Sequence, residues 1–391
     1  MRTDMPNRLE EHGFDMDVVK RTPTPFYYYD MALLDKTIDL IYRQTRNNPF
    51  KIHYAVKANS NPHILKAISG HGIGADVVSG GELRTAVDNG FKPADINFSG
   101  VAKMDWEIKL GLELEIGCFN VESSAELNII NDIAGQMGKS ANIVLRVNPD
   151  IDAHTHRYIT TGTAANKFGI SLGDLDELVG STLRLRHVNL RGLHFHIGSQ
   201  ITQKQPFVML CDTANSLLTK YRNQGFRFDI INVGGGLGID YSAPDDHPFA
   251  PFEDYFDTFR RHLDVEPGMM VHFELGRSIV AACGTLMSRV VYIKEQQGRK
   301  FALIDAGMND LLRPALYGAS HVIQNLTSEE ALREPYDVAG PICESSDVFA
   351  TSCMLPLTRR GDIIAIRSAG AYGESMASCY NMRPLPASVC V

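Results

Sequence analysis

A lysine directly follows an apolar run early in the sequence. Residues 52–56 predict a buried strand, and Lys57 stands where that strand ends, before a segment of helical spacing at 61–70. Burying an ammonium group is costly unless its charge is paired or removed. Lysines with a depressed pKa react with carbonyl groups to form imines, so Lys57 is a candidate for covalent catalysis. The alternative is a surface lysine whose aliphatic stem covers apolar neighbours.

Further polar residues and glycines stand at the ends of later predicted strands. They are Asp76, Arg146, Asn148, the segment 196–200, the glycine-rich segment 234–238 and the segment 274–277. Consecutive glycines allow backbone N–H groups to surround an oxyanion, and Ser199, Gly276 and Arg277 could complete such a site. These residues therefore predict a phosphate site, although segment 234–238 on its own could be a tight turn.

Two histidines and one glutamate could serve a flat cofactor ring. His194 and His196 alternate along a predicted strand, so they share a face and could bind a metal, but no third ligand group accompanies them. An imidazole stacked on a ring is the better interpretation, and one of the two could be a core histidine. Glu274 opposite a pyridine nitrogen would keep that ring protonated. The alternative for Glu274 is a helix cap or a surface carboxylate.

Eight predicted strands alternate with helical segments between residues 51 and 280. The strands are 52–56, 74–78, 96–99, 116–121, 143–147, 190–197, 228–233 and 269–274. This number of units predicts a (β/α)₈ TIM barrel whose site lies at the carboxyl ends of the strands. We assign residues 31–277 to this α/β barrel, with Asp30 as the cap of a first helix at 31–46.

The alternation of strands and helices stops after about residue 280. Short strands at 286–293, 300–305, 320–324, 336–338 and 362–366 predict a mostly antiparallel β-sandwich or barrel domain. An aromatic strand at 26–29 lies outside the barrel and could join that sheet. We therefore expect residues 1–30 and 278–391 to form one discontinuous β domain. Residues 1–24 read as irregular, and the His, Thr and Gly content of the loop 150–166 suggests mobility, while the sequence leaves open whether this loop closes as a lid.

The composition excludes several classes of protein. With 44% hydrophobic and 21% charged residues, the 391-residue chain can form a packed core. The net charge of −8 argues against a nucleic-acid partner. No apolar run approaches the ~18–20 residues that span a membrane, and the N-terminus does not resemble a signal peptide. The seven cysteines include no C-x-x-C pair, which favours free thiols in a reducing cytoplasm over disulfides or zinc.

Taken in order, these motifs resemble the fold-type III enzymes that use pyridoxal 5'-phosphate (PLP). This group contains alanine racemase and the ornithine decarboxylase-like decarboxylases, and within it the chain is most similar to the diaminopimelate decarboxylase family. The matching segments are 54–59, 76–83, 146–149, 167–170, 196–200, 343–347, 370–373 and 380–384. One departure is Leu275, where the family usually has the proline of Glu-Pro-Gly-Arg, so the backbone loses a restraint on φ.

The resemblance implies a role for each matching residue. Lys57 would carry PLP as an imine, His196 would stack on its ring, and Glu274 would pair with the ring nitrogen. The implied cofactor-binding residues are Lys57, Asp76, His196, Ser199, Gly235, Gly236, Glu274, Gly276, Arg277 and Tyr372. The implied substrate-binding residues are Arg277, Arg313, Tyr317, Glu344 and Tyr372. The implied catalytic residues are Lys57, His196, Glu274 and Cys343, with no metal.

The resemblance also implies the reaction and the assembly. The substrate would be meso-2,6-diaminopimelate, decarboxylated to L-lysine at the end of lysine biosynthesis. Arg277 and Arg313 suit carboxylates, and Glu344 suits a distal ammonium. Cys343 or a water on its side would return the proton. Cys343 and Glu344 are expected to enter the neighbouring subunit's site in a homodimer, although a cysteine can also be a small buried core residue.

Three other functions remain open at this stage. The chain could decarboxylate another diamino acid, such as D-ornithine, D-lysine or L-ornithine, but Arg313 would then lose its purpose. It could racemise amino acids on the same fold, with Tyr317 or Tyr372 as the second base. It could also be a non-catalytic PLP-carrying barrel, although a carrier would not need the second domain.

Overall fold

The computed structural model describes residues 13–151 and 166–391, which form two compact units. The first, which we call the barrel unit, comprises Asp35–Ile239 and Phe249–Ile279. The second, the β unit, comprises the chain up to Leu34, Asp240–Pro248 and Val280–Val391. The barrel bounds expected from the sequence, 31–277, include Asp240–Pro248, which the structure assigns to the β unit. The loop 150–166 falls almost wholly on residues outside the described ranges.

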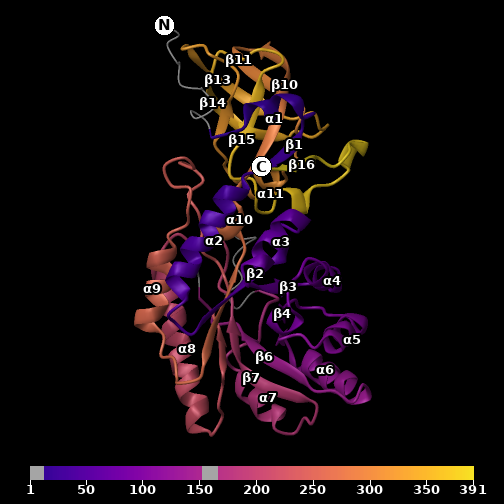
Figure 1. The fold of residues 1–391 in the computed structure, drawn as a ribbon, viewed down its shortest axis with the longest axis vertical. Helices are drawn as coiled ribbons and strands as arrows, with labels where there is room; N and C mark the ends of the chain where they lie inside the picture. Colours follow the sequence, from indigo (N-terminus) through magenta and orange to yellow (C-terminus); the bar gives the residue numbers. More distant parts are fainter. Residues whose placement is uncertain (1–12, 152–165) are drawn as a thin grey trace. The chain divides into compact units, whose positions relative to one another are not determined.

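Eight parallel strands close into a barrel, which confirms the predicted fold class (Figure 1). The strands are β2 (Phe50–Ala55), β3 (Gly74–Val77), β4 (Ile96–Phe98), β5 (Cys118–Val121), β6 (Ala141–Val147), β7 (Val188–Phe195), β8 (Ile230–Asn232) and β9 (Met270–Leu275). The barrel closes where β9 pairs with β2, in a register that sets His53 beside Glu274. Because all eight strands run parallel, their carboxyl ends meet at one mouth.

Helices alternate with the strands along the chain and surround them in Figure 1. They are α2 (Met31–Thr45), α3 (Pro62–Gly70), α4 (Gly80–Asp88), α5 (Asp105–Leu114), α6 (Ser124–Gln136), α7 (Leu175–Thr182), α8 (Gln205–Asn223), α9 (Phe252–His262) and α10 (Arg277–Val280). The predicted cap of α2 is present, because Asp30 Oδ1 accepts a hydrogen bond of 2.8 Å from the Leu33 N–H.

Packing of α9 on β9 illustrates how the sequence pattern makes the barrel core. Phe252, Tyr255, Phe256 and Phe259 recur at helical spacing, so they form one buried face of α9. Phe256 and Phe259 each meet the Phe273 ring of β9 edge-on, with centroids 5.1 Å apart. Replacing Phe273 by alanine should cost about 3–5 kcal/mol of stability, as is typical of a buried aromatic residue.

The β unit contains an eight-stranded, mostly antiparallel sheet. Its strands are β1 (Phe26–Tyr29), β10 (Gly284–Gln296), β11 (Arg299–Ile304), β12 (Ile323–Asn325), β13 (Arg333–Ala339), β14 (Val348–Pro356), β15 (Ile363–Ile366) and β16 (Ala387–Cys390). As the sequence suggested, β1 joins this sheet, antiparallel to β10 and parallel to β16. A short helix, α11 (Arg313–Tyr317), lies between β11 and β12.

The N-terminal region contains a helix where irregular chain was expected. Helix α1 (Met16–Arg21) begins after Asp15, whose side chain accepts from the N–H groups of Asp17 and Val18 at 3.0 and 3.1 Å. Phe14 packs edge-on against Tyr28 with ring centroids 5.3 Å apart. The expectation was wrong because this six-residue helix depends on its cap and on tertiary packing, not on a long periodic pattern.

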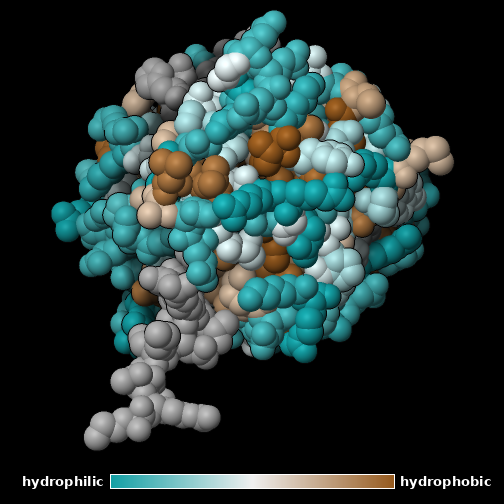
Figure 2. Space-filling model, turned by 90° about the horizontal axis from the view of Figure 1, so that it is seen from above, coloured by the Kyte–Doolittle hydropathy of each residue, from teal (hydrophilic) through white to brown (hydrophobic). Residues whose placement is uncertain are grey.

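The surface in Figure 2 is largely hydrophilic on the face shown. Hydrophobic residues appear there as small groups separated by hydrophilic ones. Within residues 13–151 and 166–391, no helix combines the length and the apolar character needed to cross a membrane.

Candidate active site

Lys57 lies in a single 3₁₀ turn, η2 (Val56–Ala58), directly after β2. Val56 and Ala58 are buried, but the Lys57 side chain is exposed. The expectation of a buried ammonium group was therefore wrong, because the strand ends two residues earlier and a short turn carries Lys57. Lys57 nevertheless interacts electrostatically with Asp76 and His196. Its surroundings, not its burial, distinguish it from an ordinary surface lysine.

Glu274 on β9 is a buried carboxylate with three side-chain partners. The amides of Asn120 and Asn232 donate to its Oε1 at 2.9 and 2.7 Å, and His194 Nε2 lies 3.0 Å from its Oε2. Burial alone would raise the pKa of Glu274, but His194 and the Asn232 hydrogen bond outweigh it and hold that pKa below the ordinary value. Glu274 is therefore ionised at neutral pH.

A chain of hydrogen bonds connects Glu274 to a second buried carboxyl group, Asp76 on β3. Asn120, which binds Glu274, also donates to Ser99 Oγ at 2.7 Å, and Ser99 Oγ donates to Asp76 Oδ1 at 2.6 Å. Burial, and then the charge of Glu274, raise the pKa of Asp76 well above its ordinary value, although Lys57 opposes this. The two carboxyl groups therefore have widely separated pKa values, a pattern that is typical of catalytic sites.

His196 follows β7 and is partly buried. Its Nδ1 lies 3.2 Å from the backbone N–H of Gly235, which can only donate, so Nδ1 must be unprotonated. Burial, followed by the charges of Lys57 and Arg146, lowers the pKa of His196 well below its ordinary value. His196 is thus a neutral imidazole with its proton on Nε2, a form that can stack on a flat ring.

The glycines after β8 occupy positions that other residues could not. Gly234 and Gly236 have φ values of +70° and +108°, in the region that favours glycine. A Cβ at Gly235 would lie 2.0 Å from the Glu274 carbonyl oxygen. The loop is fastened to the segment after β7, because Ile201 N donates to the Gly236 carbonyl at 2.8 Å. Backbone N–H groups in such a tight loop can hold an oxyanion.

Ser199 and Arg277 lie together beside this loop. Arg277 is buried, and its Nη2 donates to Ser199 Oγ at 3.0 Å. A Cβ at the intervening Gly276 would approach the Ala58 side chain to 3.0 Å, so the chain passes close to the Lys57 turn. The glycines, a hydroxyl group, a guanidinium group, the ionised Glu274 and the neutral His196 fit PLP, which combines a phosphate with a basic pyridine ring.

Two of the motifs matched in the sequence are joined in the barrel unit. Arg146 Nη1 lies 2.5 Å from Glu122 Oε1, and Glu122 Oε2 accepts from the Gly169 N–H at 2.8 Å. The Arg146 guanidinium group also lies over the Phe168 ring, 4.8 Å from its centroid. The ion pair therefore fixes the segment 167–169 against the end of β6.

The remaining predicted residues belong to the β unit. Arg313 is buried on α11, Tyr317 ends the same helix, and Tyr372 has a left-handed backbone with a φ of +57°. Cys343 and Glu344 are exposed, so the alternative of a buried structural cysteine is wrong. Their loop is fastened through the segment near 380, because Tyr380 donates to Glu344 Oε1 at 2.5 Å and Cys343 N donates to Asn381 Oδ1 at 3.1 Å.

The residues that hold Glu274 and Asp76 in place were not predicted from the sequence. Asn120, Asn232 and Ser99 are buried polar residues at the ends of short apolar strands. A buried asparagine in such a strand was the available signal, since it needs a hydrogen-bonding partner inside the barrel. His194, which was one of two possible core histidines or metal ligands, lies against Glu274. Among the described residues, no group of three or more His, Cys, Asp or Glu side chains could hold a metal ion.

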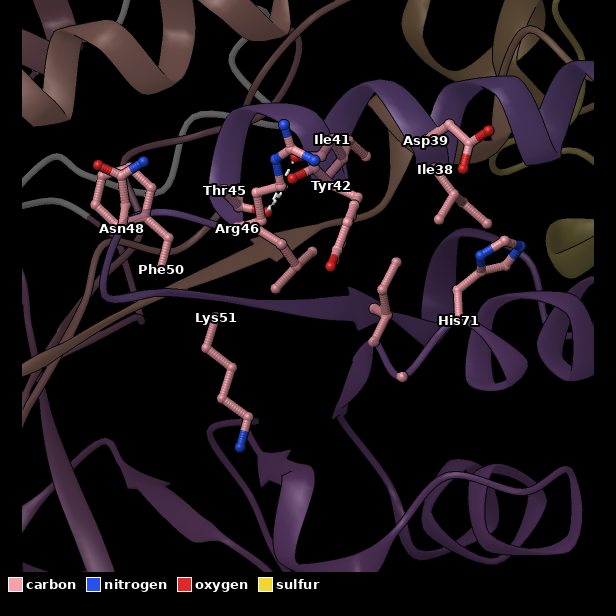
Figure 3. A pocket seen from close by; sticks show the side chains of 13 residues that line it. Ile38, Asp39, Ile41, Tyr42, Thr45, Arg46, Asn48, Phe50, Lys51 and His71 are labelled. Carbon is pink, nitrogen blue, oxygen red and sulfur yellow. Dashed lines mark hydrogen bonds between the residues drawn. The ribbon is translucent and has the colours of Figure 1, made fainter.

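A cleft of about 440 Å³ lies elsewhere on the barrel unit (Figure 3). Ile38 and Tyr42 of α2 line it, together with Arg46, Lys51 and His71. Lys51 is near the beginning of β2, where it pairs with Asp95. The candidate catalytic residues follow the carboxyl ends of the strands, so this cleft is separate from the candidate active site.

Comparison with known proteins identifies the family. The family model of the pyridoxal-dependent decarboxylases, pyridoxal binding domain, matches residues 36–281. The chain is 52% identical to diaminopimelate decarboxylase of Bacteroides thetaiotaomicron over 95% of this chain and 97% of that protein. It is 41% identical to the Vibrio cholerae enzyme over 96% and 89%.

Solved structures agree with the sequence relatives. Diaminopimelate decarboxylase from Helicobacter pylori, complexed with L-lysine, matches with a TM-score of 0.91 and 38% identity over 96% of this chain and 93% of that one. The lysine/ornithine decarboxylase of Vibrio vulnificus matches with a TM-score of 0.83, but at 20% identity it supports the fold alone. The carboxyl ends of the barrel strands carry a site that fits PLP, and the chain belongs to the diaminopimelate decarboxylase family of pyridoxal-dependent decarboxylases.

Proposed function

We propose that this chain decarboxylates meso-2,6-diaminopimelate to L-lysine and CO₂ with PLP as cofactor, the last step of lysine biosynthesis. The observation that carries the proposal is the buried, ionised Glu274 beside the neutral His196 and the glycine loop. Relatives at 41–52% identity bear the name of this enzyme. The Helicobacter pylori relative was solved with L-lysine, the product that the reaction would release.

When bound, PLP supplies a protonated pyridine ring that draws electrons from the substrate α-carbon as CO₂ leaves. In our proposal Lys57 holds the cofactor covalently, and Glu274 keeps the ring nitrogen protonated. His196 would stack on the ring. Ser199, Gly235, Gly236, Gly276 and Arg277 would hold the phosphate, and Asp76 and Tyr372 would complete the cofactor site.

The substrate has two charged ends, and charged side chains of the chain suit them. We assign carboxylate recognition to Arg277 and Arg313, because guanidinium groups bind carboxylates bidentately. Tyr317 and Tyr372 would contact the substrate, and Glu344 would bind the distal ammonium group. After CO₂ leaves, a proton is returned to the α-carbon from Cys343 Sγ or from a water beside it.

A homodimer with shared sites would explain why Cys343 and Glu344 are exposed on a fastened loop. Met382 in the neighbouring segment is 96% exposed, an unusual position for a large apolar side chain unless another surface covers it. We propose that a second copy of the chain covers this segment and receives Cys343 and Glu344 in its own site. We place the enzyme in the cytoplasm, as the cysteine content suggests.

The proposal is tested with purified protein and PLP. CO₂ release is measured with meso-diaminopimelate, L-ornithine, L-lysine, L-arginine and D-ornithine, and the stereochemistry of the remaining amino acid is analysed. We expect CO₂ and L-lysine from meso-diaminopimelate and at most slow turnover of the others. Stereoisomers formed without CO₂ would identify a racemase, and faster release from a substrate with one carboxylate would contradict the assigned specificity.

A further inference from the structure

Arg313 in the β unit is enclosed by two aromatic side chains. Its Nη1 lies 2.8 Å from His321 Nε2, and its guanidinium carbon lies 4.6 Å from the centre of the Tyr241 ring. The His321 and Tyr241 rings meet edge-on, with centroids 5.2 Å apart. Arg313 and His321 are only 5% and 8% exposed. We call these three residues the Arg313 cluster.

The hydrogen bonds of His321 determine its protonation state. Its Nδ1 lies 2.8 Å from the backbone carbonyl of Arg367, which can only accept, so Nδ1 carries a proton. Its Nε2 faces the Arg313 guanidinium group, which can only donate, so Nε2 must be the acceptor. His321 is therefore neutral and in a single tautomer. An imidazolium would lose this acceptor and bring two cations together.

Neighbouring contacts hold the cluster in position. Tyr241 belongs to the segment Asp240–Pro248, and Asp245 of that segment pairs with Arg367 at 2.8 Å. Gln324 on β12 contacts both partners, donating to Asp245 at 3.2 Å and accepting from Arg367 at 2.9 Å. The backbone that orients His321 is thus attached to the segment that carries Tyr241.

We propose that His321 and Tyr241 are positioning residues that fix the Arg313 guanidinium group to receive the second carboxylate of the substrate. The proposal rests on the role of Arg313 in the proposed function. A free arginine side chain samples many rotamers, and fixing it beforehand removes part of the entropy cost of binding. The cluster thereby favours substrates with two carboxylates over diamino acids with one.

The test compares two substitutions of His321 in the PLP-loaded enzyme. His321→Leu removes both hydrogen bonds, and His321→Gln retains a donor and an acceptor. We expect His321→Leu to raise KM for meso-diaminopimelate about 10- to 100-fold, the range for losing a hydrogen bond to a charged group, with kcat changed less than about threefold. His321→Gln should recover most of this loss. The control is His71→Leu, at a histidine of the separate cleft whose side chain is 37% exposed, and it should behave as wild type.

Combining His321→Leu with Arg313→Ala separates positioning from general damage. If His321 acts through Arg313, its substitution adds nothing to KM in the Arg313→Ala background. An undiminished effect there, or a wild-type KM in His321→Leu, would overturn the proposal. If Arg313→Ala alone leaves KM unchanged, the proposed substrate contact of Arg313 is wrong, and with it the purpose of the cluster.

Nitrogen NMR of the wild-type holoenzyme tests the cluster without relying on turnover or on the folding of a variant. With ¹⁵N-labelled histidine, the His321 signals are identified by their absence from the His321→Gln spectrum. We expect a protonated Nδ1 and an unprotonated Nε2 at neutral pH. A protonated Nε2 would show that His321 does not accept from Arg313 and would refute the positioning role, even if Arg313 binds the substrate.

Discussion

Replacing Glu274 by glutamine removes one buried charge while preserving the shape of its site. The glutamine oxygen can still accept from Asn120 and Asn232, the two donors that now contact Oε1 at 2.9 and 2.7 Å. The new amide group would face His194, which can change tautomer and accept in place of donating. The barrel should therefore fold, but the proposed partner of the cofactor ring would be neutral.

The expected loss in activity can be estimated from this single change. Removing one preorganised electrostatic group from a transition state typically lowers kcat about 100- to 1,000-fold, or about 2.7–4 kcal/mol. Folding loses at most the charge-assisted hydrogen bond between His194 and Glu274, about 1.5–3 kcal/mol. We therefore expect kcat of Glu274→Gln to fall 100-fold or more, while the purified variant remains folded and retains covalently bound cofactor.

The assay is steady-state CO₂ release from meso-diaminopimelate, with thermal unfolding measured in parallel. A matched control is Glu115→Gln, because the Glu115 side chain is 80% exposed and its pair with Lys139 lies at the surface. The control should show wild-type kcat and stability. A folded Glu274→Gln enzyme with kcat within threefold of wild type would refute the role of this carboxylate.

Three further predictions follow from other parts of the chain. Gly235→Ala should weaken PLP binding at least tenfold, because the added Cβ would lie 2.0 Å from the Glu274 carbonyl oxygen. Cofactor titration measures this affinity. The control Gly180→Ala, where no atom lies within 4 Å of the added Cβ, should bind PLP as wild type does. Met382→Asp should shift the protein from dimer to monomer in light scattering, since Met382 is 96% exposed at the proposed interface; an unchanged mass would place the interface elsewhere. Burial, followed by the charge of Lys51, lowers the pKa of His53 to about 4, so the folded state prefers the neutral ring. The unfolded state therefore binds a proton at His53 below about pH 6.5, while the folded state does not until the pH reaches about 4. The free energy of unfolding should fall by about 3 kcal/mol over that window. In denaturant unfolding, the free energy of unfolding of His53→Gln should fall less than that of wild type over the same pH range. An equal fall in both proteins would contradict the role of His53.

The barrel could be predicted from the sequence because each strand is a short apolar run bounded by turn residues. All eight predicted strands overlap observed ones, from β2 to β9. In the β unit, β14 and β16 were missed. Most residues of β14 are at least partly exposed, so this strand lacks an alternation of apolar and polar residues. Strand β16 has only four residues, and its pairing with β1 joins opposite ends of the chain. Neither feature leaves a local pattern.

The reactive side chains were easier to predict than the residues that orient them. Glu274 and the glycine loop stand at strand ends, a position that indicates function in a barrel. Asn120 donates to Glu274, which is 154 residues away in the sequence, and His321 contacts Arg313, which is 8 residues away. Only the folded chain brings the two members of each pair together. The burial of Lys57 was mispredicted because a 3₁₀ turn, and not the strand itself, carries this residue.

The proposed function depends on covalent attachment of the cofactor to Lys57. The most direct measurement is borohydride reduction of the PLP-loaded protein, followed by proteolysis and mass spectrometry of the peptides. We predict one phosphopyridoxyl group per chain on Lys57 and none in a Lys57→Ala variant that remains folded. A reduced cofactor on another lysine, or no covalent label at all, would contradict the account.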